Sequence, residues 1–152
     1  MPKKMQFLMG FATFLTIANL ALLPESIAQN SQSNFAGRGV ASGSIFNRGR
    51  NANVSLTTNR DNFGFEMAET SGNRGRIQYR GSIIRRSNSS NNSRSFTLDG
   101  RVQTFTSSTN LRPINNTTGT CQIEVFDSRV ISSTCRTVSS DSTTRFMGLE
   151  QF

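Results

Sequence analysis

A row of arginines is the part of this sequence whose residue types and spacing could do chemistry. In and just before residues 75–86, which we expect to form a strand, four arginines share one parity and face away from Ile77 and Tyr79. The four are Arg74, Arg76, Arg80 and Arg86. Arg76 and Arg80 would stand ~13 Å apart along such a strand. Guanidinium groups in a row suit phosphate, sulfate or carboxylate groups, so these arginines are candidates for anion binding.

Cross-strand charge pairing is the alternative interpretation of the same arginines. If residues 63–69 pair with residues 75–86 about Gly72, Glu66 lies diagonal to both Arg76 and Arg80. Part of the row would then consist of solvated ion pairs, which contribute little to stability. The sequence alone leaves both interpretations open.

The residues that are missing exclude several kinds of catalysis. The chain has no His, so neither a Ser-His-Asp nor a Cys-His arrangement can form. The only lysines are Lys3 and Lys4, and no Gly-rich phosphate loop ending in Lys is present. Of the closest acids, Asp61 lies in an expected turn, while Glu66 and Glu69 point to opposite faces of a strand, unlike the paired carboxylates of a glycosidase. We therefore expect no enzymatic activity, no cofactor and no metal site.

The two cysteines predict a disulfide. The midpoint between Cys121 and Cys135 is residue 128, the centre of an expected three-residue turn, so an antiparallel hairpin places the two directly opposite each other. The same register places Val125 opposite Ile131. A crosslink closing a loop of this size stabilises by about 3 kcal/mol in the chain-entropy model. The wide spacing and the lack of an activating His argue against a redox pair.

Period-2 alternation, interrupted by clusters of Asn, Gly and Ser, predicts an all-β chain of short antiparallel strands. We expect eight strands, at residues 38–46, 52–58, 63–69, 75–86, 94–106, 119–126, 130–138 and 143–152. The main loops expected between them are residues 47–51, 87–93 and 107–118. Phe105 breaks the alternation of its strand, which indicates a bulge or a strand end. Sequential hairpins favour a meander, either barrel-like or folded into a two-layer sandwich.

One hairpin can be registered from the sequence. Centring it on Gly72 pairs three residues of each strand on one face: Met67 with Ile77, Phe65 with Tyr79, and Phe63 with Gly81. An aromatic ring over a strand glycine covers the missing side chain. The apolar side chains that we expect in the interior are Phe63, Phe65, Met67, Ile77, Tyr79, Phe96 and Leu98.

The first 28 residues have the pattern of a signal peptide. Lys3 and Lys4 precede an apolar run over residues 7–23, and Ser26-Ile27-Ala28 offers small residues for cleavage before Gln29. A retained membrane anchor is the alternative, although the run is at the lower length limit for a span. We expect residues 29–152 to be one small secreted or periplasmic domain without a transmembrane helix.

These features predict an exported, non-catalytic binding or structural protein of the cell envelope or extracellular space. Its arginine-rich sheet face would contact acidic polysaccharide or anionic lipid. We do not expect nucleic acid as a partner, because the Arg-Gly segments are few and no row of aromatics accompanies them. One alternative is a lipocalin-like carrier with a small apolar ligand among the interior side chains. Another is a small outer-membrane barrel, for which the strand count fits but the aromatic girdles are missing.

Overall fold

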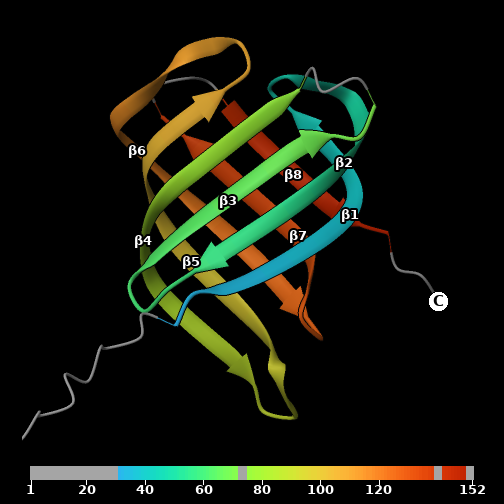
Figure 1. Ribbon diagram of the computed structural model, residues 1–152, viewed down its shortest axis with the longest axis vertical. Coiled ribbons are helices and arrows are strands. Elements are labelled where there is room, and N and C mark those ends of the chain that lie inside the picture. Colours follow the sequence, from blue (N-terminus) through green and yellow to red (C-terminus); the bar gives the residue numbers. More distant parts are fainter. Residues whose placement is uncertain (1–30, 72–74, 139–141, 150–152) are drawn as a thin grey trace, which may run out of the picture.

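The computed structural model describes residues 31–71, 75–138 and 142–149, which form eight antiparallel strands closed into a barrel (Figure 1). The strands are β1 (Ser33–Gly43), β2 (Phe46–Thr58), β3 (Asn62–Glu69), β4 (Arg76–Ser89), β5 (Asn92–Ser107), β6 (Asn110–Phe126), β7 (Arg129–Thr137) and β8 (Ser142–Gly148). Each strand pairs with the next along the chain, and β8 pairs with β1. The predicted all-β meander of eight strands is confirmed, and its closure selects the barrel over the sandwich. The predicted signal peptide, residues 1–28, lies outside the described residues.

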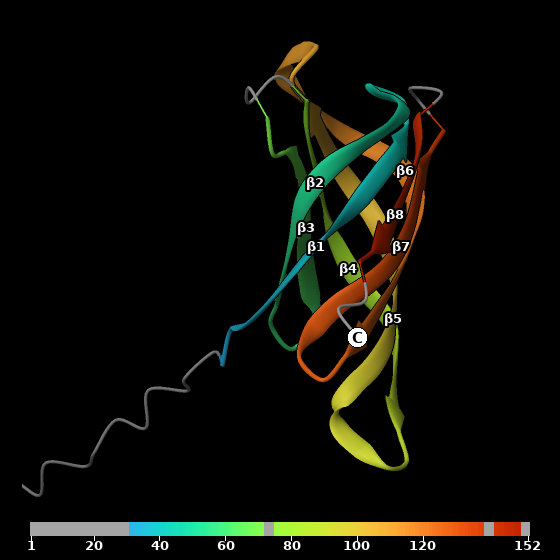
Figure 2. The same ribbon diagram turned by 90° about the vertical axis from the view of Figure 1, so that its right-hand side faces the viewer.

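Three predicted loops are wrong because the strands continue through them. Residues 47–51 belong to β2, and the turn comes earlier, where Gly43 and Ser44 have positive φ values of 87° and 48°. Residues 87–93 and 107–118 extend the β4–β5 and β5–β6 hairpins, leaving only short turns. The β4–β5 hairpin protrudes beyond the barrel (Figure 2). Ladder hydrogen bonds can form between polar strands, so a polar sequence does not require a loop.

The described part of the barrel interior is a core to which all eight strands contribute. The seven predicted interior side chains are all buried, and they belong to one hydrophobic cluster. The Tyr79 hydroxyl on β4 lies 2.8 Å from the Thr144 hydroxyl on β8, a buried hydrogen bond across the interior. Burial of these apolar surfaces, at about 25 cal/mol per Å², supplies the main force that holds the barrel together.

The predicted β3–β4 register is confirmed at all three pairs. Met67 pairs with Ile77, Phe65 with Tyr79, and Phe63 with Gly81. The glycine under the aromatic ring, however, is Gly100 on β5. A Cβ added to Gly100 would lie 2.8 Å from Cδ1 of Phe63 and closer still to Cε1, whereas a Cβ at Gly81 would collide with the backbone oxygen of Arg101. The ring therefore leans across one strand to cover the glycine on the next.

The Cys121–Cys135 disulfide is confirmed, with the two residues directly opposite each other and their Cα atoms 4.1 Å apart. The turn that joins β6 to β7 contains two residues, Asp127 and Ser128, both with positive φ. Because this turn is one residue shorter than predicted, Val125 pairs with Val130, and the predicted pairing of Val125 with Ile131 is wrong. A bulge on β7 restores the register before the cysteines.

The seam between β1 and β8 closes the barrel over a short stretch. Only four pairs join these strands, from Gly39 opposite Gly148 to Ser42 opposite Arg145. A Cβ added to Gly39 would collide with the backbone oxygen of Met147. Glycine is therefore needed at this position because β1 lies directly against the backbone of β8.

Candidate functional site

The predicted arginine row is divided by the structure. Arg76 and Arg80 are both exposed on the outer face of β4, while Arg74 lies outside the described residues. Arg76 donates to Glu66 on β3, with Nη2 2.7 Å from Oε1. This is the cross-strand ion pair that the alternative interpretation expected. Arg76 is therefore already paired with a carboxylate, whereas Arg80 forms no ion pair with the described part of the chain.

The prediction that Arg86 shares the outer face with Arg76 and Arg80 is wrong. The register between β4 and β5 shifts between Ile83 and Arg85, so Arg86 pairs with Leu98, whose side chain is buried. The guanidinium carbon of Arg86 lies 3.8 Å from the centroid of the Phe96 ring. At this distance the cation is attracted to the face of the ring. Arg86 therefore covers one end of the core.

A different set of arginines gathers on the outer surface. We call it the arginine belt; its members are Arg80 on β4, Arg101 on β5, Arg136 on β7 and Arg145 on β8, all four exposed.

The registers place these four side chains side by side around the barrel. Arg101 and Arg136 both pair with Thr120 of the intervening strand β6, so they stand two strands, or roughly 10 Å, apart. Arg145 lies diagonally across from Arg136, because Arg136 pairs with Thr143. Arg80 lies two residues from Ser82, the partner of Arg101, across a bulge that makes Thr104 the direct partner of Arg80. Diagonal neighbours in a sheet are about 7–8 Å apart, so the four charges form a continuous band.

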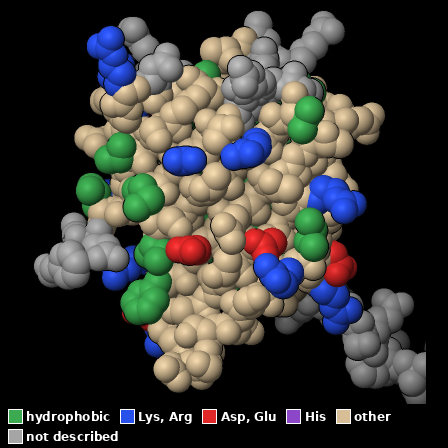
Figure 3. All heavy atoms as spheres, turned by 180° about the vertical axis from the view of Figure 1, so that it is seen from behind, with side chains coloured by type: hydrophobic (Ala, Val, Ile, Leu, Met, Phe, Trp, Pro, Cys, Tyr) green, Lys and Arg blue, Asp and Glu red, His purple; other side chains and the backbone are tan. Residues whose placement is uncertain are grey.

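The charges of the arginine belt are not balanced by neighbouring carboxylates. Among the residues that the structure describes, none of the four arginines forms an ion pair. The nearby carboxylates are already engaged: Glu66 bonds Arg76, and Asp99 accepts from Nε and Nη2 of Arg85 at 2.9 and 2.6 Å. On the rear face, the basic side chains of the upper half have no acidic neighbour, while the acidic side chains lie lower, beside further basic ones (Figure 3). Like charges at this spacing repel, and a bound anion would relieve that repulsion.

The arginine belt could not be found from spacing along the chain, because its members lie on four strands. The residues on either side of each member do indicate that its side chain faces outward. Arg101, for example, stands between Gly100 and Val102, which face inward, and Arg145 stands between the buried residues Thr144 and Phe146. An arginine flanked by inward residues projects outward. Only the pairing of the strands then shows which outward arginines are neighbours.

Neither a metal site nor a membrane-spanning helix is evident in the described ranges. No group of three or more His, Cys, Asp or Glu residues there is placed to hold a metal ion. The described residues also contain no helix that is long and hydrophobic enough to cross a bilayer.

Comparison of the chain with protein-family models, with curated proteins and with solved structures finds no match in any of the three. A function must therefore be argued from the chemistry of the molecule's own surface.

Proposed function

We propose that this chain is an exported, non-catalytic binding protein that holds acidic polysaccharide of the cell envelope or extracellular space on its arginine belt. The observation that carries the proposal is the set of four neighbouring arginines without an ion pair among the described residues. The disulfide supports the exported location, because such bonds persist in oxidising compartments. The signal-peptide pattern of the first 28 residues supports it independently.

The spacing of the arginine belt suits a linear polyanion better than a single small anion. Neighbouring charges are separated by about 7–10 Å and follow the curved outer surface. A polysaccharide carries carboxylate or sulfate groups repeatedly along one chain, so several of them can meet guanidinium groups at once. Thr120 lies between Arg101 and Arg136 and is exposed, so its hydroxyl can exchange hydrogen bonds with sugar hydroxyls.

Hydrogen-bonding side chains on β6 support a polysaccharide over an outer-membrane barrel or an interior carrier. Thr120 and Gln122 face outward beside the arginine belt, where they can bond sugar hydroxyls, while the exposed apolar residues Val138 and Met147 lie two residues beyond Arg136 and Arg145. In an outer-membrane barrel, arginine on the lipid-facing side would cost about 2–4 kcal/mol at the midplane. A carrier function would need space among side chains such as Tyr79, which is fully buried and hydrogen-bonded to Thr144.

Retention on immobilised polygalacturonate and dextran sulfate, eluted with salt, tests the proposal. The belt variant is Arg101→Gln, Arg136→Gln and Arg145→Gln. Exposed ion pairs are worth about 0.2–1 kcal/mol each, so losing three weakens binding by about tenfold and lowers the eluting salt concentration.

The matched control removes the same charge elsewhere, by Arg48→Gln, Arg60→Gln and Arg94→Gln, and we expect it to elute close to the wild type. Equal loss in both variants would mean that net charge alone drives retention and would overturn the proposal. Retention of the belt variant at the wild-type salt concentration would do the same. Binding to phosphatidylglycerol vesicles but to neither polysaccharide would replace the polysaccharide with a lipid surface.

A further inference from the structure

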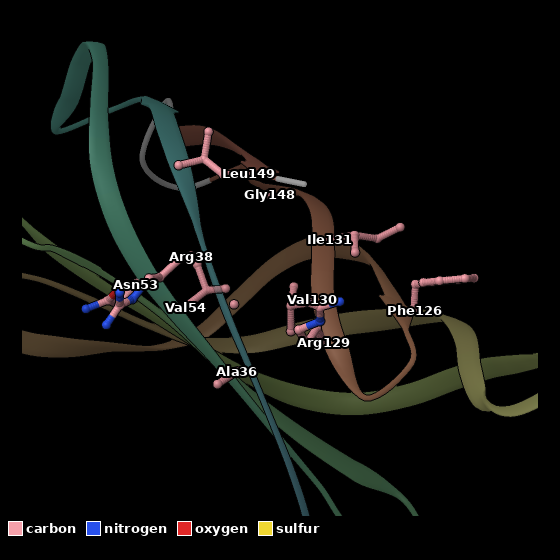
Figure 4. A pocket seen from close by; sticks show the side chains of 11 residues that line it. Ala36, Arg38, Asn53, Val54, Phe126, Arg129, Val130, Ile131, Gly148 and Leu149 are labelled. Carbon is pink, nitrogen blue, oxygen red and sulfur yellow. The ribbon is translucent and has the colours of Figure 1, made fainter. Parts of the chain in front are cut away.

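A groove opens at the seam of the barrel (Figure 4), and no member of the arginine belt lines it. Strand β8 ends at Gly148, which lies opposite Gly39, and the N–H of Leu149 still donates to the backbone oxygen of Arg38 at 2.9 Å, so residues 33–37 of β1 continue without a β8 partner. Over this stretch β1 meets β7 through a single parallel pair, Ala36 with Arg129. The seam groove that results has a volume of about 1050 Å³. This is slightly above the range for small-molecule sites, about 300–1,000 Å³.

The floor of the seam groove is part of the hydrophobic core. Val54 and Val130 line it, and their side chains are only 3% and 2% exposed. Gly37 lies against both, since a Cβ added there would collide with the backbone oxygen of Val130 and stand 3.0 Å from a methyl carbon of Val54. Strand β1 therefore packs directly on the two valines and covers them, so the exposed apolar surface of the groove comes from its walls.

The walls of the seam groove expose large apolar side chains. Phe126 is 56% exposed and Leu149 is 64% exposed, and both line the groove together with the half-buried Ile131. Phe126 and Ile131 lie on the β7 side, while Leu149 follows β8 (Figure 4). An exposed apolar patch continuous with a groove marks a place where an apolar ligand gains by leaving water.

Two arginines complete the seam groove. Arg38 on β1 and Arg129 on β7 both line it, and both are exposed. Arg129 is the pairing partner of Ala36, and Arg38 lies two residues further along the same face of β1. Neither arginine forms an ion pair with any residue that the structure describes. The groove therefore combines two unbalanced positive charges with an apolar surface.

We propose that the seam groove binds a single-chain carboxylate amphiphile of the long-chain fatty acid type. The positive charges of Arg38 and Arg129 attract the carboxylate, and the hydrocarbon chain packs against the apolar side chains of Phe126, Ile131 and Leu149. Charge complementarity selects this occupant, since an uncharged apolar ligand would leave both guanidinium groups without a partner. The site differs from the arginine belt in both place and chemistry, and either can exist without the other.

Calorimetric titration of the full exported protein with monomeric oleate tests this assignment. We expect saturable binding of one oleate per chain. Arg38→Gln with Arg129→Gln weakens oleate by at least about tenfold, because hydrogen bonds to a charged group are worth about 1.5–3 kcal/mol. Oleyl alcohol has the same chain and no charge, so its affinity stays the same in that variant. Phe126→Ser or Leu149→Ser, each at an exposed position, weakens both ligands.

The belt variant serves as the control, because it removes three positive charges from another surface and should bind oleate like the wild type. No saturable binding of oleate would overturn the proposal. So would unchanged oleate affinity after substitution of Arg38 and Arg129, or an equal loss in the belt variant. Loss of oleate binding with polysaccharide retention intact would separate the failure of this site from that of the proposed function.

Discussion

The Phe63 ring occupies the space above Gly100, and this contact predicts a coupling between two substitutions. A Cβ on Gly100 would stand 2.8 Å from both Cδ1 and Cζ of the ring and closer to Cε1. The ring is 3% exposed and belongs to the core, so it has little freedom to move away. All the atoms in conflict lie beyond Cγ, and a valine at position 63 has none of them.

The magnitudes follow from this geometry. Gly100→Ala overpacks the core at about 1–3 kcal/mol, less about 0.4–1 kcal/mol gained by restricting the unfolded chain, so we expect a net loss of about 1–2 kcal/mol. Phe63→Val costs about 2–3 kcal/mol, somewhat less than the 3–5 kcal/mol of a Phe→Ala change. The double variant should lose no more than Phe63→Val alone, because the added methyl group fills vacated space. The coupling free energy is then at least about 1 kcal/mol in favour of the double variant.

Urea unfolding followed by far-ultraviolet circular dichroism measures all four members of the cycle, and their m-values should agree. If the loss of unfolding free energy in the double variant equals the sum of the two single losses to within about 0.5 kcal/mol, the Phe63 ring does not occupy the space above Gly100 as argued. The matched control is Gly81→Ala combined with Phe63→Val. Gly81 pairs directly with Phe63, yet an added Cβ there meets the backbone oxygen of Arg101. Shortening Phe63 cannot relieve that conflict, so we expect no coupling in the control.

Three further substitutions test the closure and capping of the barrel. Replacing Cys121 and Cys135 by Ala should lower the free energy of unfolding by about 3 kcal/mol in the same urea assay, and a loss below about 1 kcal/mol would contradict a stabilising crosslink. Gly39→Ala should destabilise by about 1–3 kcal/mol because its Cβ meets a β8 backbone oxygen, whereas Gly64→Ala, with no atom within 4 Å, should be neutral or slightly stabilising; equal effects would show that the seam is not tightly closed. Arg86→Ala should cost about 0.5–1 kcal/mol through loss of the cation–ring contact, and no change in the thermal midpoint would count against that contact.

The parts of the fold that could be predicted are those in which local alternation decides the outcome. In the β3–β4 hairpin, three apolar pairs fit only one register, so shifting it by a single residue would have turned them to the solvent. The cysteine pair determined the register of a second hairpin, β6–β7, because a disulfide between antiparallel strands requires closely opposed residues. Even there, the turn was misjudged by one residue, and the bulge on β7 absorbed the difference.

The remaining errors in the predicted loops and faces arise from the pairing between strands, which the sequence of one strand does not determine. Whether polar residues such as those of 107–118 form a loop or an extended hairpin depends on backbone hydrogen bonds, to which side-chain hydropathy is a poor guide. The bulge beside Ile84 likewise inserts one residue and turns Arg86 to the other face, which reverses a prediction made from parity. The arginine belt depends on the register of five strands at once. No pattern within a single strand contains that information.

The seam connects the closure of the barrel to its two candidate sites. Where β1 pairs with β8, Arg145 lies opposite Ser42 on the outer face, so the closed stretch of the seam carries one end of the arginine belt. Beyond Gly148 the described residues continue this seam only through the hydrogen bond from the N–H of Leu149 to the Arg38 oxygen, and β1 then packs over the buried valines of the seam groove. A sheet edge that lacks a partner strand must be covered or kept polar to avoid association with other chains. Here it is flanked by apolar side chains and by two arginines, Arg38 and Arg129, which keep the edge charged. Because β8 ends at Gly148, it closes the barrel along β1 as far as Gly39 and leaves the seam groove open beyond that point.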